Sequence, residues 1–216
     1  MAAVKNSFNS EVSKKEKEDF FLAVKDGDNV AVGAFIKKHK GVISLKRDVD
    51  GHTALILAIE KGHRDTVELL LENGASSSEG LPWAAGSGYK DIVKQLLDWG
   101  ADINARDTYG WTALMTAAHT GHNEIIELLL DYGADIDVCA ESGATALKCA
   151  QKFGMAGYAQ ASTIELLEQA QQPGKQKERL ARQQERLFKE ADCSRGLRHA
   201  VPAAPLLSFS KKRRTP

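Results

Sequence analysis

The chain has 216 residues, 43% of them hydrophobic and 27% charged, which is typical of a soluble folded protein and excludes a low-complexity or fibrous chain. The formal net charge is zero, but residues 174–216 carry twelve basic and four acidic side chains, so the part before them is acidic. The three cysteines have no CxxC spacing, and no apolar run fits a signal peptide or a membrane span. We therefore expect a cytoplasmic protein, with the nucleus as an additional location.

The N-terminal residues 1–17 are predicted to be a flexible segment. A first, degenerate helical unit is expected over residues 18–47. There Ala23 and Gly27 take the places that Ala58 and Gly62 hold in the next unit.

The later units repeat with a period of 33 residues, since GADI at 100–103 recurs at 133–136. The turn GHTAL at 51–55 recurs as GWTAL at 110–114 after 59 residues, seven fewer than two periods. The missing residues lie between Gly74 and Leu81, so the third unit has lost its turn segment. The sequence predicts units at about 48–76, 77–103, 107–136 and 140–170.

Each unit has the pattern of two helices. A threonine before the first helix is a suitable N-cap, and a glycine ends that helix where a left-handed residue is usually needed. The second helix carries apolar residues at helical spacing. One unit cannot bury its own apolar faces, so several must stack. The capping threonines are Thr53, Thr112 and Thr145, and the glycines are Gly62, Gly88, Gly121 and Gly154.

These residues resemble the ankyrin repeat, through GHTAL at 51–55, GWTAL at 110–114 and the Gly-His pairs at 62–63 and 121–122. The resemblance covers residues 18–170 and implies a repeat domain over residues 18–172, an all-α ankyrin solenoid of about five units with short hairpin or loop fingers. The chain departs from the family pattern where alanine replaces the usual proline after the capping threonine. The resemblance implies a non-catalytic interaction module or adaptor with one or more proteins as partners.

Two segments follow the repeats. Residues 173–192 are predicted to be a charged helix with a narrow apolar stripe at Leu180 and Leu187, which favours a surface cap over a coiled-coil dimer and hence a monomer. Residues 193–216 are predicted to be a disordered basic tail. Its cluster is a candidate nuclear address, which supports the alternative of a nuclear regulatory cofactor. The cluster consists of Lys211, Lys212, Arg213 and Arg214.

No residue set in the sequence points to catalysis. His119 and His122 form an HxxH, but His122 belongs to the repeated Gly-His turn, and no acidic or cysteine partner has metal-ligand spacing. Direct nucleic-acid binding is not expected, since the body is acidic and the tail lacks an aromatic stacking platform. We expect no cofactor and no metal, and an enzyme or metal protein is the weakest alternative.

The resemblance places the partner surface on the fingertips and first helices, which together form a concave strip in the family. The third unit has no fingertip. The candidate residues carried over by position are Asp50, His52 and Lys61 in the second unit and Tyr109, Trp111, His119 and Thr120 in the fourth.

A notch is expected where the third finger is missing. Pro82 is best tolerated in a first helical turn, so the first helix of the third unit is predicted to start late, with Trp83 at its start. Trp83, Tyr109 and Trp111 would then be the anchors of the partner surface. The alternative is that Trp83 fills the space of the missing finger and packs inside.

Overall fold

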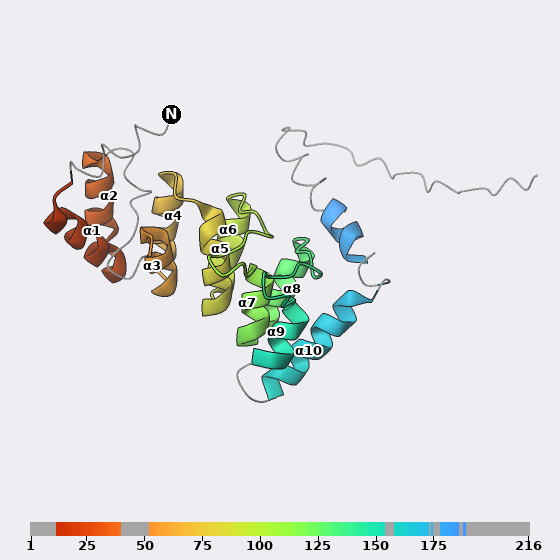
Figure 1. Ribbon diagram of the computed structural model, residues 1–216. Coiled ribbons are helices and arrows are strands. Elements are labelled where there is room, and N and C mark those ends of the chain that lie inside the picture. Colours follow the sequence, from red (N-terminus) through yellow and green to blue (C-terminus); the bar gives the residue numbers. More distant parts are fainter. Residues whose placement is uncertain are drawn as a thin grey trace, which may run out of the picture. The chain divides into compact units, whose positions relative to one another are not determined.

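Within the described residues, five helix pairs follow one another along the chain (Figure 1). The computed structural model describes residues 12–39, 52–153, 158–172, 174, 178–185 and 188. Residues 178–185 form a further helical segment. The pairs are α1 (Lys14–Asp26) with α2 (Asn29–Lys38), α3 (Ala54–Glu60) with α4 (Arg64–Glu72), α5 (Ser77–Ser87) with α6 (Lys90–Asp98), α7 (Ala113–Thr120) with α8 (Asn123–Asp131), and α9 (Ala146–Phe153) with α10 (Tyr158–Gln171).

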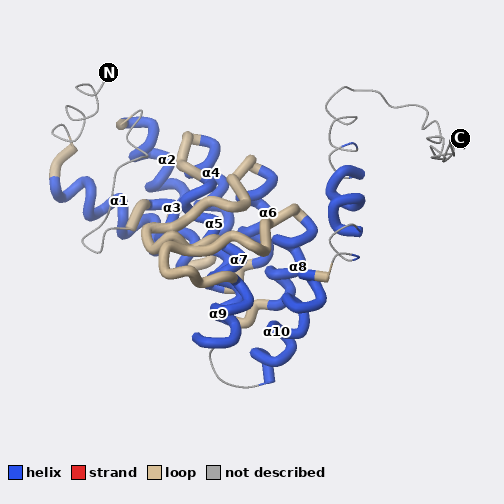
Figure 2. The backbone as a smooth tube through the Cα atoms, turned by 45° about the vertical axis from the view of Figure 1, so that its right-hand side comes forward, coloured by secondary structure: helices blue, strands red, loops and turns tan. Residues whose placement is uncertain are grey.

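The pairs stack in two layers. The first helices α1, α3, α5, α7 and α9 pack against one another in that order and form the first-helix layer, while the second helices form the second-helix layer. The loops 101–112 and 134–145, termed fingers here, lie together on one side (Figure 2). The described residues form no strand, and one finger carries an isolated antiparallel bridge between Arg106 and Thr112. The predicted all-α solenoid is confirmed.

Two rows of equivalent side chains build the core. Small alanines in the first helices let neighbouring helices approach, and one leucine in each of four second helices is completely buried behind them. Burying a leucine stabilises the fold by about 1.5–3 kcal/mol, so the leucine row supplies much of the driving force for stacking. The rows are Ala58, Ala84, Ala117 and Ala150, and Leu70, Leu96, Leu129 and Leu167, all 0% exposed.

The first unit begins earlier than expected. Helix α1 starts at Lys14, so the end of the predicted flexible segment 1–17 is wrong. The cause is a capping box, in which the Ser13 hydroxyl accepts from the Glu16 backbone N–H and the Glu16 carboxylate accepts from the Ser13 backbone N–H. Glu16 also lies 2.6 Å from the ammonium of Lys38 on α2. One carboxylate therefore caps α1 and ties it to α2.

This double role makes the first unit sensitive to acid. The hydrogen bonds from Lys38 and Ser13 lower the pKa of Glu16 from 4.5 to about 2. A carboxyl with a lowered folded-state pKa adds stability above its unfolded pKa and loses it as the pH falls towards the folded value. We expect the melting temperature of the wild type to fall between about pH 5 and pH 2, and the Glu16→Gln variant to show a weaker fall.

The matched control for this prediction is Glu18→Gln on the same helix, where the Lys14 ammonium is 3.8 Å from the carboxylate and both side chains are exposed. Thermal melts followed by circular dichroism at several pH values measure the difference. Parallel pH profiles for the wild type and Glu16→Gln would contradict the assigned role.

The third unit departs from the expectation at its first helix. Helix α5 begins at Ser77 and contains Pro82 in its interior, so the late start predicted from the proline is wrong. Gly80 lies buried against α3, where a Cβ would be 2.6 Å from the Ile59 Cδ1 atom. The glycine lets added helical turns take the place of the missing finger, and Trp83 consequently lies in the middle of α5 instead of at its start.

A ring at the start of each of three second helices joins neighbouring units. Each ring lies over the glycine that ends the first helix of the preceding unit and reaches a backbone carbonyl next to it. His63 Nε2 is 2.9 Å from the Lys25 carbonyl, the Tyr89 hydroxyl donates to the Glu60 carbonyl at 3.5 Å, and His122 Nε2 is 3.2 Å from the Gly86 carbonyl. The covered glycines are Gly27, Gly62 and Gly88.

Residues 178–183 lie against the end of α8. The Gln183 amide donates to the Tyr132 carbonyl at 3.5 Å, and the Arg182 guanidinium is 3.9 Å from the Asp131 carboxylate. A Cβ on Gly133 would overlap the Gln183 amide, so the glycine permits this approach. These contacts are those expected of a surface cap.

Candidate interaction surface

The finger of the fourth unit holds a rigid turn. The Asp107 carboxylate accepts from the backbone N–H groups of Tyr109 and Trp111, each at 2.8 Å, and the Asp107 N–H donates to the Trp111 carbonyl at 2.9 Å. The Tyr109 side chain is 77% exposed at the tip of this turn. A large aromatic side chain is therefore presented on a backbone that is already fixed.

Trp111 and His119 form an aromatic pair beside the finger. Their ring centroids are 5.5 Å apart in an edge-to-face arrangement, and both side chains are half-buried. Thr120, at the end of α7, is also half-buried, and its hydroxyl donates to the Thr116 carbonyl at 3.0 Å. The three predicted residues thus lie on α7 and its finger with partly accessible surfaces.

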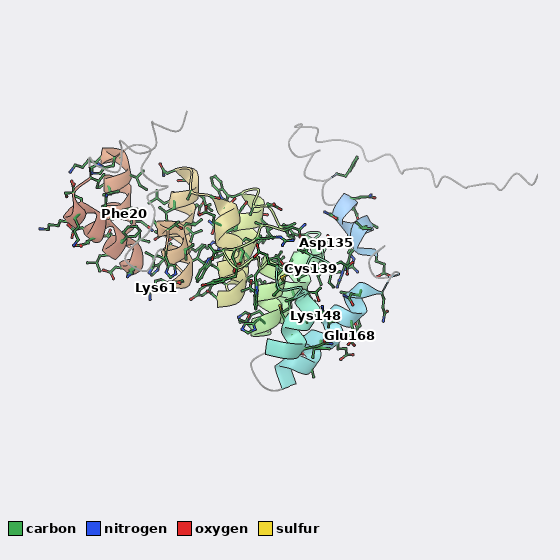
Figure 3. The ribbon with its side chains drawn as sticks, viewed as in Figure 1. Phe20, Lys61, Asp135, Cys139, Lys148 and Glu168 are labelled. Atoms are coloured by element: carbon green, nitrogen blue, oxygen red, sulfur yellow. The ribbon has the colours of Figure 1, made fainter. Side chains whose placement is uncertain are left out.

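A second aromatic pair joins the second and third units. The rings of His52 and Trp83 are 5.1 Å apart, again edge to face, and both side chains are half-buried. His52 Nδ1 also lies 3.7 Å from the Glu60 carboxylate. Lys61, which directly follows α3, is exposed, as is Lys148 on α9 (Figure 3). Trp83 therefore packs on the core, as expected of a residue that fills the space of the missing finger, and also keeps an accessible surface, as expected of an anchor for a partner.

The middle first helices carry less charge than the later second helices. The helices α4, α6, α8 and α10 contain ten acidic and three basic residues, whereas α3, α5 and α7 contain two charged residues, Glu60 and Glu79. The helices that hold or adjoin the two aromatic pairs therefore carry little charge, whereas α4, α6, α8 and α10 are acidic. Contacts to helices of little charge depend on ring packing and hydrogen bonds, and they respond weakly to salt.

Some of the predicted site residues lie outside the part of the chain that the structure describes. Asp50 and the basic cluster Lys211–Arg214 lie outside the described part of the chain. Within that part, His, Cys, Asp and Glu side chains do not gather in groups of three or more that could hold a metal ion, and none of the helices could span a membrane. Burial raises the pKa of the Cys149 thiol to about 11, which keeps it protonated near neutral pH.

Asp107 organises the finger but was not among the residues selected from the sequence. Its spacing of two and four residues from Tyr109 and Trp111, followed by Gly110, is the signal of a side-chain-capped turn. The contacts of residues 178–183 with α8 could not be found in this way, because they join segments about fifty residues apart in sequence.

Comparison with known proteins agrees with the repeat. The family model described as ankyrin repeats (3 copies) matches residues 3–79 and 81–176. The ankyrin repeat and SAM domain-containing protein 6 of Mus musculus is 34% identical over 108 residues, which are 46% of this chain and 12% of that protein. The protein of the same name from Rattus norvegicus is 41% identical over 108 residues, with the same shares of 46% and 12%.

The ankyrin repeat domain-containing protein SAT10 of Stachybotrys chartarum is 42% identical over 72 residues, 32% of this chain and 4% of that protein. The chain therefore spans at most 12% of the length of these relatives. Ankyrin repeats generally serve as protein–protein interaction modules. Because the family model covers most of the sequence, this chain belongs to the ankyrin repeat family.

Proposed function

We propose that this chain is a non-catalytic adaptor that binds one or more partner proteins through its fingers and first-helix layer. The observation that carries the proposal is the finger at Asp107, which exposes 77% of Tyr109 on a turn held by three hydrogen bonds. A preorganised turn loses little entropy on binding, and tyrosine offers a large contact area with few rotatable bonds. Tyr109 is therefore the first anchor of the proposed interface.

The surroundings of Tyr109 support the same assignment. Trp111 with His119, and Trp83 with His52, add partly accessible aromatic surface in the same layer. Aromatic residues are enriched among the side chains that dominate binding energy at protein interfaces. Because α3, α5 and α7 carry little charge, we propose a partner that binds this layer by shape and apolar contact, with a weak salt dependence.

The test is the Tyr109→Ala variant in affinity capture from cell extract, followed by mass spectrometry of the bound proteins. The wild type is expected to capture a defined set of partner proteins. The variant is expected to bind them about thirtyfold more weakly, which corresponds to a loss of about 2 kcal/mol of binding free energy. The backbone turn needs the Asp107 carboxylate and not the tyrosine ring, so the fold is expected to survive.

Trp99→Ala is the matched control, because Trp99 is an exposed aromatic (45%) at the end of α6 in the second-helix layer. The control is expected to capture the same partners as the wild type. A Tyr109→Ala variant that retains them all, while Trp99→Ala loses them, would place the interface on the other layer.

A further inference from the structure

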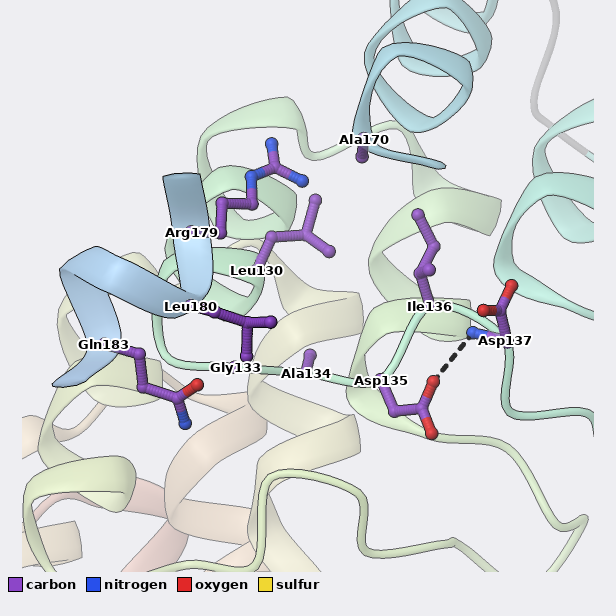
Figure 4. A pocket seen from close by; sticks show the side chains of 10 residues that line it. All are labelled: Leu130, Gly133, Ala134, Asp135, Ile136, Asp137, Ala170, Arg179, Leu180 and Gln183. Carbon is purple, nitrogen blue, oxygen red and sulfur yellow. Dashed lines mark hydrogen bonds between the residues drawn. The ribbon is translucent and has the colours of Figure 1, made fainter. Parts of the chain in front are cut away.

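A pocket lies at the C-terminal end of the repeats, apart from the aromatic surface. It has a volume of about 310 Å3 and lies between the last finger, the ends of α8 and α10, and residues 179–183 (Figure 4). Leu130 and Ile136 form a nearly buried apolar wall, and Leu180, which is 59% exposed, faces the same space. The carboxylates of Asp135 and Asp137 lie along the finger side. This site is termed the end pocket.

The finger side of the end pocket is the open edge of a hydrogen-bond ladder. Ser78 Oγ accepts from the Asp102 N–H at 2.9 Å, and one unit later Asn104 Oδ1 accepts from the Asp135 N–H at 3.0 Å. Each finger thus donates a backbone N–H to a polar side chain of the unit before it. Asp137 follows Asn104 by one period and holds the next acceptor position.

The repeat register places no N–H at the next donor position. Thr66 and Thr163 hold equivalent places, since both are fully buried threonines that donate to the asparagine at the start of an earlier second helix. Ten residues after Thr163, at the donor position, the sequence has Pro173. Pro173 lies outside the described residues, but a proline has no N–H in any conformation. Within the described residues, the ladder therefore ends at Asp137.

The size and charge of the end pocket restrict what it binds. The volume of about 310 Å3 lies at the lower end of the range for small-ligand pockets, about 300–1,000 Å3, so the end pocket can hold a large side chain but not a folded element. The end pocket is lined by two carboxylates and one guanidinium group, and a separate neighbouring cleft adds three carboxylates and a second guanidinium group, so the combined surroundings attract cations. These groups are Asp135, Asp137 and Arg179 in the end pocket, and Glu127, Asp131, Glu178 and Arg182 in the neighbouring cleft.

We propose that the end pocket binds an extended peptide segment of a partner protein that carries a large apolar side chain next to basic residues. The apolar side chain packs between Leu130, Ile136 and Leu180. A backbone N–H of the peptide donates to Asp137, as the finger of a further unit would, and the basic residues face the surrounding carboxylates. The end pocket contains none of the aromatic anchors Tyr109, Trp111 and Trp83, so the adaptor has a second, chemically distinct binding site.

The experiment measures binding of a fluorescein-labelled synthetic peptide, in which leucine and phenylalanine precede a run of lysines and arginines, to the full chain by fluorescence anisotropy. The wild type is expected to bind it, and Leu180→Glu to bind at least about tenfold more weakly. Asp137→Lys is expected to weaken binding to a similar degree. A peptide with glutamines in place of its basic residues is expected to bind about tenfold more weakly than the basic one.

Two control variants make the result decisive. Leu22→Glu introduces the same change at a leucine of α1 with matched exposure, 58% against 59% for Leu180. Glu141→Lys repeats the charge change of Asp137→Lys at an exposed residue of the same finger that does not line the end pocket. Wild-type binding by both controls supports the proposal. Equal binding by the wild type and Leu180→Glu, or equal losses in Leu180→Glu and Leu22→Glu, overturns it.

Discussion

The Gly80→Leu variant is expected to lose about 3 kcal/mol of unfolding free energy, the upper part of the range for overpacking a filled core. A Cβ at this position would lie 2.6 Å from Ile59 Cδ1 and 3.2 Å from Leu55 Cδ2, and the rest of a leucine side chain has no room between α3 and α5. Ile59 is 0% exposed, so it cannot turn aside into solvent. Urea denaturation followed by circular dichroism measures the loss.

Gly33→Leu is the matched control, because nothing lies within 4 Å of a Cβ built on this glycine of α2. Leucine is a better helix former than glycine, so the control is expected to gain up to about 1 kcal/mol. If both variants shift the unfolding midpoint in the same direction, then α5 does not rest on α3 through Gly80.

The Gly88→Val variant is expected to cost about 3 kcal/mol, from two causes. Gly88 has a φ of +82°, a conformation in which a β-branched residue is strained. A Cβ would also lie 2.8 Å from His122 Cε1, in the ring that reaches the Gly86 carbonyl. The substitution therefore strains the end of α5 and disturbs its junction with the fourth unit.

Gly100→Val separates the two causes. Gly100 has a φ of +79°, but nothing lies within 4 Å of its would-be Cβ, so backbone strain of about 1–2 kcal/mol is its whole expected cost. The excess at Gly88, about 1 kcal/mol, measures the ring contact. In a His122→Ala background this excess should vanish. An excess that persists there would assign it to another neighbour.

The helix pairs were predictable because their signals are local. Thr53 and Thr112 accept from the backbone N–H three residues later, at 3.3 and 3.4 Å, as their positions indicated. The capping box at Ser13 and Glu16 is equally local and was available in the sequence, although the first helix was predicted to start later. Signals of this kind depend on a few neighbouring residues and need no knowledge of the packing.

The start of α5 could not be predicted in the same way. Pro82 by itself favours a first-turn position, yet the helix extends five residues before it, from Ser77. The deciding interaction is the close approach of Gly80 to Ile59, a contact between units that shows no local pattern. Tertiary packing therefore outweighed the local preference of the proline, and it also moved Trp83 away from the helix start.

The residues of the candidate site were predictable from the sequence, but the exposure of each side chain was not. Tyr109 and Trp111 are two residues apart on one finger, and the sequence gives no reason to rank them. Asp107 and the ring of His119 decide the outcome, since they leave Tyr109 77% exposed and Trp111 half-buried. Neighbours brought together by folding, and not residue type, determine which aromatic side chain is the better anchor.

The rings over the turn glycines also provide native spectroscopic reporters. His63 lies at the junction of the first and second units, Tyr89 at the next and His122 at the third. In a repeat array, stability is a sum over such nearest-neighbour junctions, and they need not open together. Proton resonances of these three rings, followed through a denaturant titration, would therefore show the order in which the junctions open without any introduced label.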